Sequence, residues 1–362
     1  MSRNASESNV AVTLVTLGLV CFLYSLRNKW LLLIAALSFS LSLFTYHGNH
    51  IFTPLLVLIL IMIYRKSLRE NRWWKWSLGT LVLLAAIIFS QTLLHADKTK
   101  ISGLFPLGET AKIYAEVILP RTQHPVQNLV VQITHNRVRY LIKSVIVNYV
   151  RGLSPEFLFI SGGTNRQHNI SNFGNLYLWE VFVWPLALYW LVKTRSRAGK
   201  FLILWLLIAP MAASITRDAP HSNREMGMLP LPAVLTAYGL GLLLSYTHSS
   251  WQKVGLLVLS VGVVSISQLA HLDNYFVHFP INSAQYWGKS FESLVGKVGQ
   301  LENNYKEVII SRPDRSSYIY FLFFNKVDPR YYQKEVVRYP ETNEGFQHVE
   351  RFAKLAFNKI DW

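Results

Sequence analysis

Charged residues are scarce in this 362-residue sequence. Only 15% of the residues are Asp, Glu, Lys or Arg, while 51% are hydrophobic; average soluble domains contain about 25% charged residues. The apolar residues also occur in runs close to the length that a membrane-spanning helix needs. Together these features exclude an ordinary soluble globular protein and predict a helical protein of the membrane.

Cysteine is almost absent, because Cys21 is the only one. The chain therefore forms no intramolecular disulfide and no cysteine-based metal site. Walker loops, Gly-rich dinucleotide fingerprints, His-Glu-x-x-His helices and nucleophile elbows are absent too. These absences argue against nucleotide chemistry. The first apolar run lacks the basic flank of a removable signal peptide.

The apolar runs predict about eight membrane-spanning helices. They cover residues 10–26, 30–46, 51–64, 77–94, 176–192, 201–215, 226–246 and 254–272. We expect four spans in 1–94, a long connection over 95–175, four more spans in 176–272 and a tail over 273–362. The expected fold is an all-α polytopic bundle with a small extracytoplasmic α/β tail module.

Basic residues orient the chain, whose formal net charge is +16. Lys and Arg gather in alternate short turns, at 27–29, 65–75, 193–200 and 253. By the positive-inside rule these turns face the cytoplasm, so both chain ends, 95–175 and the tail lie outside. Contact of these turns with membrane lipids accounts for the charge, so nucleic acid is not an expected partner. We expect an integral protein of a prokaryotic plasma (inner) membrane.

Two outer segments have recognisable patterns. Apolar residues recur at helical spacing over 126–149, opposite polar and basic ones, which predicts an amphipathic helix. It lies either in the membrane interface with its basic face toward headgroups, or against the outer domain of the protein itself. In the tail, an amphipathic stretch at 287–298, a strand at 307–311 and an aromatic stretch at 318–324 predict the α/β module.

Polar clusters all fall on the expected outer side. They are Arg3 with Glu7, the turn 46–50 with its two histidines, Arg166 with His168 in a Gly-bearing loop, and 216–224. In 216–224, which is the densest, His221 and Arg224 are expected to converge on a phosphate while Asp218 orients one of them. The alternative is a capped turn anchored at the interface. Two histidines without a carboxylate are a weak metal signal.

These clusters resemble those of GT-C membrane glycosyltransferases of the protein-mannosyltransferase and aminoarabinose-transferase type, which take sugar from a polyprenyl-phosphate carrier. The resemblance covers most of 1–272. It is carried by Ser2-Arg3-Asn4-Ala5-Ser6-Glu7-Ser8-Asn9 before a span, by 40–46 with His47, by 154–159 with Arg166 and His168, and by 216–224. Relative to that family, the chain starts at the second outer loop, without the preceding helices and the first catalytic loop.

Seven residues are expected in the site, and the resemblance itself implies the roles of Arg3, Glu7, His168, His221 and Arg224. Glu7 and Asp218 are expected in catalysis, and the residues expected to bind the carrier phosphate are Arg3, Arg166, His168, His221 and Arg224. It also implies a polyprenyl-phosphate-linked sugar as donor and a protein, lipid or glycan as acceptor. Such transfer needs a base for the acceptor hydroxyl and positive charge at the departing phosphate. No cofactor is required, and a divalent metal stays open.

Other functions remain open from the sequence. A lipid-linked glycan ligase is the nearest alternative, and a transporter or a non-catalytic membrane scaffold belongs to a different class. A transporter is expected to show ionisable residues at mid-membrane depth or helices broken at corresponding positions of two halves. The predicted spans are nearly free of charge.

Overall fold

The computed structural model describes residues 6–94, 110–123, 129–311, 316–341 and 347–358. The described residues form two compact units: those from 6 to 273 belong to the first, and those from 274 to 358 to the second. The regular elements described in the first unit are all helices, and the second unit combines helices with a small sheet. The expected helical class is therefore confirmed.

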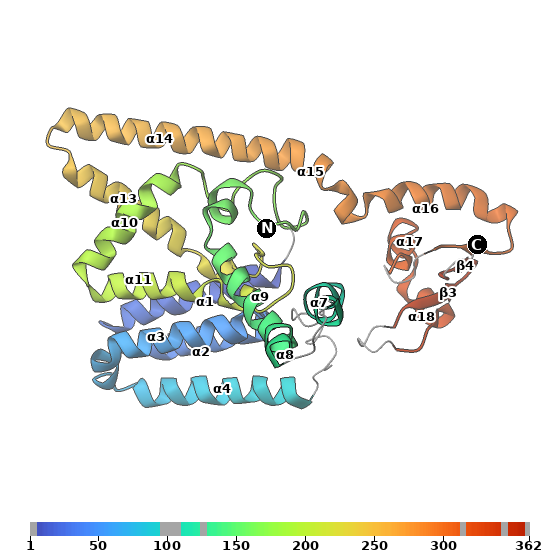
Figure 1. The fold of residues 1–362 in the computed structure, drawn as a ribbon, viewed down its shortest axis with the longest axis horizontal. Helices are drawn as coiled ribbons and strands as arrows, with labels where there is room; N and C mark the ends of the chain where they lie inside the picture. Colours follow the sequence, from blue (N-terminus) through green and yellow to red (C-terminus); the bar gives the residue numbers. More distant parts are fainter. Residues whose placement is uncertain (1–5, 95–109, 124–128, 312–315, 342–346, 359–362) are drawn as a thin grey trace. The chain divides into compact units, whose positions relative to one another are not determined.

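Helices α1 to α4 of the first unit run side by side (Figure 1). Their bounds are Glu7–Ser25, Leu31–Thr45, Asn49–Arg69 and Trp74–Leu94. Helix α1 approaches α2 closely at Gly18, where a Cβ atom would lie 2.7 Å from Phe39 Cε1. Small residues that let apolar helices approach are typical of packing in membranes, where burial of apolar surface does not drive association.

The other described helices of the first unit lie within the long connection 95–175 or after it. They are α6 Thr110–Ile113, α7 Leu119–Gln123, α8 Leu129–Thr134, α9 Arg137–Gly152, α10 Glu180–Thr194, α11 Arg197–Ile208, α12 Met211–Ser214, α13 Leu231–Tyr246 and α14 Ser250–Asp273, with π-helical turns at Tyr114–Ile118 and Glu156–Ile160 and a 3-10 turn at Met226–Met228. The expected loop at 154–159 is this second π-helical turn, and its Phe157, Leu158 and Phe159 are buried in the core.

Among the described residues, five helices are long and apolar enough to cross a membrane. They are Glu7–Ser25, Asn49–Arg69, Trp74–Gln91, Arg197–Ser214 and Ser250–Asn282, and the apolar helices Leu31–Thr45 and Leu231–Tyr246 are shorter. Helix α14 has no buried residue. Even its large apolar side chains, such as Leu257, Val258 and Leu259, are largely exposed. A helix that is apolar on every side and uncovered by protein favours a lipid environment.

Two sequence predictions about helix extent were wrong. An amphipathic helix was expected over 126–149, of which 126–128 lie outside the described residues. The described part is two helices, because the chain breaks at His135 and Asn136, where the Asn136 side chain accepts from the Arg139 amide and caps α9. The span expected from 226 begins only at Leu231, because a 3-10 turn and Pro230, which has no amide hydrogen, precede it.

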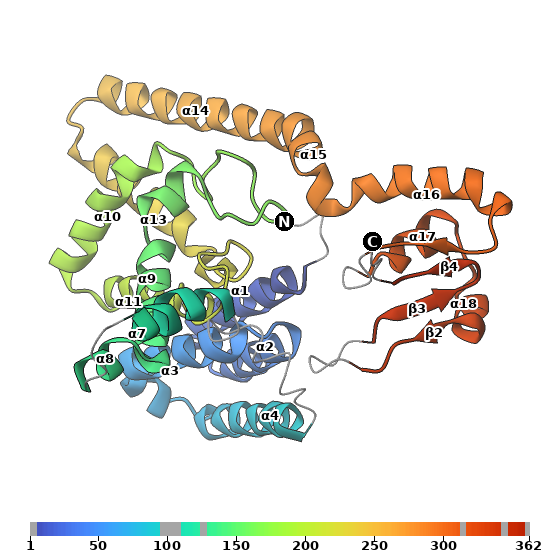
Figure 2. The ribbon, with the colours of Figure 1, turned by 45° about the vertical axis from the view of Figure 1, so that its right-hand side comes forward.

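The second unit holds a four-stranded sheet of order β1-β4-β3-β2. The strands are Val308–Ile309, Val337–Arg338, Val349–Phe352 and Leu355–Ala356, and the larger helices are α16 Lys289–Leu301, α17 Tyr318–Phe324 and α18 Pro329–Glu335. Figure 2 shows β2, β3 and β4 side by side. Strands β1 and β4 are parallel and the other pairs antiparallel. Phe321 and Phe357 lie in the core of this unit.

Candidate functional site

The polar cluster lies where the first residues of α1 meet two long loops, 161–175 and 215–225. Ser8, at the start of α1 and 1% exposed, donates to the side chain of Asn223. Asn165 and Asn169 belong to the other loop: Asn165 Nδ2 lies 3.3 Å from His221 Nε2, and the Asn169 side chain accepts from the Ser222 hydroxyl. Segments more than 200 residues apart in sequence are thus joined by partly buried hydrogen bonds.

The loop 161–175 is itself held by Asn169. Its Oδ1 accepts from the Gly163 amide at 3.0 Å and its Nδ2 donates to the Asn165 carbonyl at 2.8 Å. Gly162 has a φ of 68°, a left-handed conformation that glycine adopts without strain. Asn169 therefore fixes the loop that presents Asn165 and His168.

His168 and His221 form a pair whose ring centroids are 5.0 Å apart. His221 is 4% exposed, and the Nδ1 atoms of both rings are buried without a hydrogen-bond partner among the described residues. Burial, followed by the charge of Arg224, lowers the pKa of His221 to about 3 and lowers the pKa of His168 as well. Both imidazoles are consequently neutral at pH 7.

Arg224 supplies the positive charge of the cluster. Its Nη1 donates to Thr216 Oγ1 at 2.6 Å and to the Arg217 carbonyl at 2.5 Å, which fixes the guanidinium against the preceding turn. A guanidinium has five N–H donors, so those of Nη2 and Nε, which have no hydrogen-bond partner among the described residues, can donate to a ligand. Burial lowers the pKa of Arg224, while the nearby groups of Tyr46 and Asp218 raise it.

Tyr46 electrostatically links Arg224 with the start of α1. Burial raises the pKa of its hydroxyl, Arg224 lowers it and Glu7 raises it again. Both charged residues therefore act on the same phenol. Tyr46 is the last residue before the short turn that leads into α3 at Asn49.

Glu225 is the residue that the sequence predictions missed. It is 5% exposed, and its Oε2 has no hydrogen-bond partner among the described residues. A Cβ atom on Gly152 would lie 2.9 Å from Glu225 Oε1, so glycine at the end of α9 makes room for this carboxyl. Burial raises the pKa of Glu225 to about 8, against a smaller lowering by a backbone hydrogen bond at His221. The carboxyl is thus mainly protonated at neutral pH.

The structure brings together some of the seven predicted residues. His168, His221 and Arg224 meet as described, and Glu7 is an exposed residue in the first turn of α1. Asp218 is exposed and forms a 4.0 Å ion pair with Arg217, a surface interaction that contributes little to stability. Arg3 lies outside the described residues.

Arg166 lies beside the cluster rather than in it. It is half-buried in the same loop as His168, and among the described residues its guanidinium makes no hydrogen bond or ion pair with His221 or Arg224.

No family model matches this chain, and no curated protein matches it either. The geometry of the cluster therefore carries the functional argument. Within the described ranges, no group of three or more His, Cys, Asp or Glu residues is placed to hold a metal ion. His47 and His50 stack edge to face at 5.4 Å, and His50 Nε2 is 2.9 Å from the Leu43 carbonyl.

The arrangement is suited to an anion. It offers one fixed cation, two neutral imidazoles and a protonated carboxyl, and among the described residues Arg224 is not in an ion pair. A phosphate can accept hydrogen bonds from guanidinium and imidazole N–H groups, and its charge would be compensated by Arg224. In the sequence, the run from His221 to Glu225 lies directly before an apolar helix, and this position could have indicated that Glu225 belongs to the site. Glu225, the last residue of the run, was not predicted.

Proposed function

We propose that this chain is a membrane glycosyltransferase, or the larger part of one, that takes sugar from a polyprenyl-phosphate carrier at the extracytoplasmic face. The observation that supports this most is the half-buried Arg224 beside two neutral histidines, with no carboxylate in an ion pair with it among the described residues. A cation that has lost part of its hydration without gaining a counterion is a favourable place for a phosphate.

The reaction requires this charge at one moment in particular. The acceptor oxygen forms a bond to the anomeric carbon, the bond from that carbon to the phosphate oxygen breaks, and the phosphate gains negative charge. Donors fixed in advance lower the energy of that transition state, because they need not reorganise. The two bonds from Arg224 Nη1 to Thr216 and Arg217 provide such fixation.

A carboxylate must accept the proton of the acceptor hydroxyl. Glu7 is the better placed of the two expected acids, since it is exposed and acts on Tyr46 together with Arg224. Asp218, which is exposed and within electrostatic range of Arg224, has the role of orienting that cation. Glu225 is protonated and is not suited to act as this base.

The membrane arrangement that accompanies this function is eight crossings, with the basic turns in the cytoplasm and the tail module outside. The five helices of spanning length support it. Since the carrier lipid lies in the membrane, a site at the ends of apolar helices receives its donor without a nucleotide pocket.

A buried carboxylate in an expected span bears on the transporter alternative. Glu180 is 8% exposed, and its Oε2 accepts from the Tyr177 amide while its Oε1 accepts from Thr236. These two hydrogen bonds satisfy the buried carboxyl locally, at the first residue of α10. They account for Glu180 without an ion pathway.

The test uses the full chain in proteoliposomes. Polyprenyl-phosphate mannose, glucose and 4-amino-4-deoxyarabinose are supplied separately, and release of free polyprenyl phosphate is followed with and without added acceptor extract. We expect release from one donor, its loss in Arg224→Gln, and its retention in the matched variant Arg217→Gln. Sugar transfer from a nucleotide sugar in the absence of any polyprenyl-phosphate donor, or equal activity of both variants, would contradict the proposal.

A further inference from the structure

Helices α8 and α9 present an uncovered apolar stripe. In α9, Val138, Ile142 and Ile146 recur every four residues and are 67%, 54% and 57% exposed. Side chains at this spacing lie above one another on one face of a helix. Exposed Leu129, Val130 and Ile133 of α8 extend the apolar surface.

The opposite side of α9 is the side that packs against protein. Tyr140 is 4% exposed and packs with Ile113 and Val117. Near its end, α9 is tied to the bundle because Asn148 Nδ2 donates to the Ser214 carbonyl and Tyr149 donates to the Leu207 carbonyl. The stripe is therefore left uncovered by a helix that is otherwise firmly attached.

Cations border the stripe. Arg139 and Lys143 line an open groove of about 640 Å³ together with Ile133, Val138, Ile142 and Ile146. Within the described residues, the acidic partner of Lys143 is Glu116, at 2.7 Å with both side chains largely exposed. Arg137 and Arg151 add two further exposed cations on α9.

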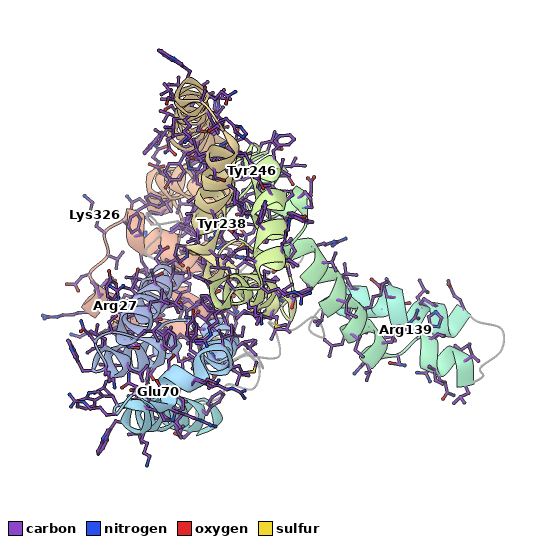
Figure 3. The ribbon with its side chains drawn as sticks, turned by 90° about the vertical axis from the view of Figure 1, so that its left-hand side faces the viewer. Arg27, Glu70, Arg139, Tyr238, Tyr246 and Lys326 are labelled. Atoms are coloured by element: carbon purple, nitrogen blue, oxygen red, sulfur yellow. The ribbon has the colours of Figure 1, made fainter. Side chains whose placement is uncertain are left out.

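The direction of α9 agrees with this chemistry. In Figure 3 the helices α1 to α4 are seen nearly end-on, whereas the arm that carries Arg139 extends across the view. If α1 to α4 cross a membrane, a helix at a large angle to them lies along the membrane surface. An apolar face with flanking cations is the pattern of helices that lie in the interface of anionic bilayers.

We propose that the stripe of α8 and α9 docks onto the bilayer surface, with acyl chains against Val138, Ile142 and Ile146 and anionic phospholipid headgroups at Arg139 and Lys143. The inference does not depend on the proposed transferase function, because it uses no residue of the polar cluster.

The experiment places a fluorescent label at single cysteines in the full chain, in a Cys21→Ser background, reconstituted into nanodiscs. Ile142→Cys probes the stripe. Val147→Cys is the matched control, since it is an exposed aliphatic position about 140° around the helix from residue 142. Discs of phosphatidylcholine alone are compared with discs containing phosphatidylglycerol, using brominated lipid and aqueous iodide as quenchers.

We expect the label at 142 to be quenched by brominated lipid and shielded from iodide, and the label at 147 to show the reverse. Phosphatidylglycerol should increase lipid quenching at 142, and Arg139→Gln with Lys143→Gln should remove that increase. Arg137→Gln with Arg151→Gln, which removes the same charge from the other side of α9, should retain it.

Three results would overturn the proposal. Equal iodide quenching at 142 and 147 would mean that water covers the stripe. Shielding of 142 from both quenchers would mean that protein covers it. Equal lipid quenching in the two kinds of disc would show that anionic headgroups are not recognised.

Discussion

Replacement of Glu225 by Gln should stabilise the protein in mildly alkaline solution. Burial raises the pKa of this carboxyl to about 8 from its usual 4.5, so between these values the folded chain holds a proton that the unfolded chain has lost. Stability then falls as pH rises. The neutral amide of Gln cannot lose this proton, so the variant should lack the decline.

His221 determines where the effect is visible. Its pKa of about 3, against the usual 6.5, makes stability rise with pH below 6.5, which opposes the effect of Glu225 there. Between pH 6.5 and 8, His221 no longer opposes the loss of stability that deprotonation of Glu225 causes. Those 1.5 pH units correspond to about 2 kcal/mol lost by the wild type, since one unit is worth about 1.4 kcal/mol.

The assay is thermal unfolding in detergent, followed by the fluorescence of the 11 tryptophans at several pH values between 6.5 and 8. A loss of about 2 kcal/mol lowers Tm by roughly 3 °C in a chain of this size, because the unfolding entropy is about 2.1 cal/mol/K per residue. The Tm of Glu225→Gln should stay constant over this pH range. The Tm of Glu70→Gln, a change at an exposed position, should fall as it does in the wild type. A parallel decline in the wild type and Glu225→Gln would refute the assignment of a buried, protonated carboxyl.

Further predictions concern the site and the topology. Glu7→Gln should lower transfer at least tenfold without changing Tm, as expected for loss of a general base; wild-type turnover would leave Glu7 with a structural role. Binding of a polyprenyl phosphate should be accompanied by proton uptake at pH 6, because an anion raises the pKa of His221; calorimetry in buffers of different ionisation enthalpy measures it, and no buffer dependence would remove His221 from the phosphate. Cysteines at Asp218 and Gly299 should react with an impermeant reagent from outside, and labelling only from the cytoplasm would overturn the topology.

The helices were predictable because long apolar runs leave little choice of structure. The ends of the helices were less predictable. The capping residue Asn136 and Pro230, which has no amide hydrogen, each moved a helix boundary. A hydropathy pattern averages over neighbouring residues and does not show the effect of one such residue. The four short strands of the second unit pair across up to 48 residues of sequence, from Val308 to Leu355, and only the first was expected.

The site was predictable in its charges but not in its environment. The proximity of His221 and Arg224 follows from their spacing, and His168 was placed with them by resemblance. Burial was not visible in sequence: it makes both histidines neutral and Glu225 protonated. Contacts from remote segments, such as Gly152 against Glu225 and Asn165 against His221, set those states.

The most direct measurement is the affinity of the purified full chain for a short-chain polyprenyl phosphate. A hydrogen bond to a charged group contributes about 1.5–3 kcal/mol, so Arg224→Gln should weaken binding by roughly 10- to 150-fold, while Arg217→Gln stays within about threefold of the wild type. Equal affinities for the wild type and Arg224→Gln would contradict the claim that this cluster holds a lipid phosphate.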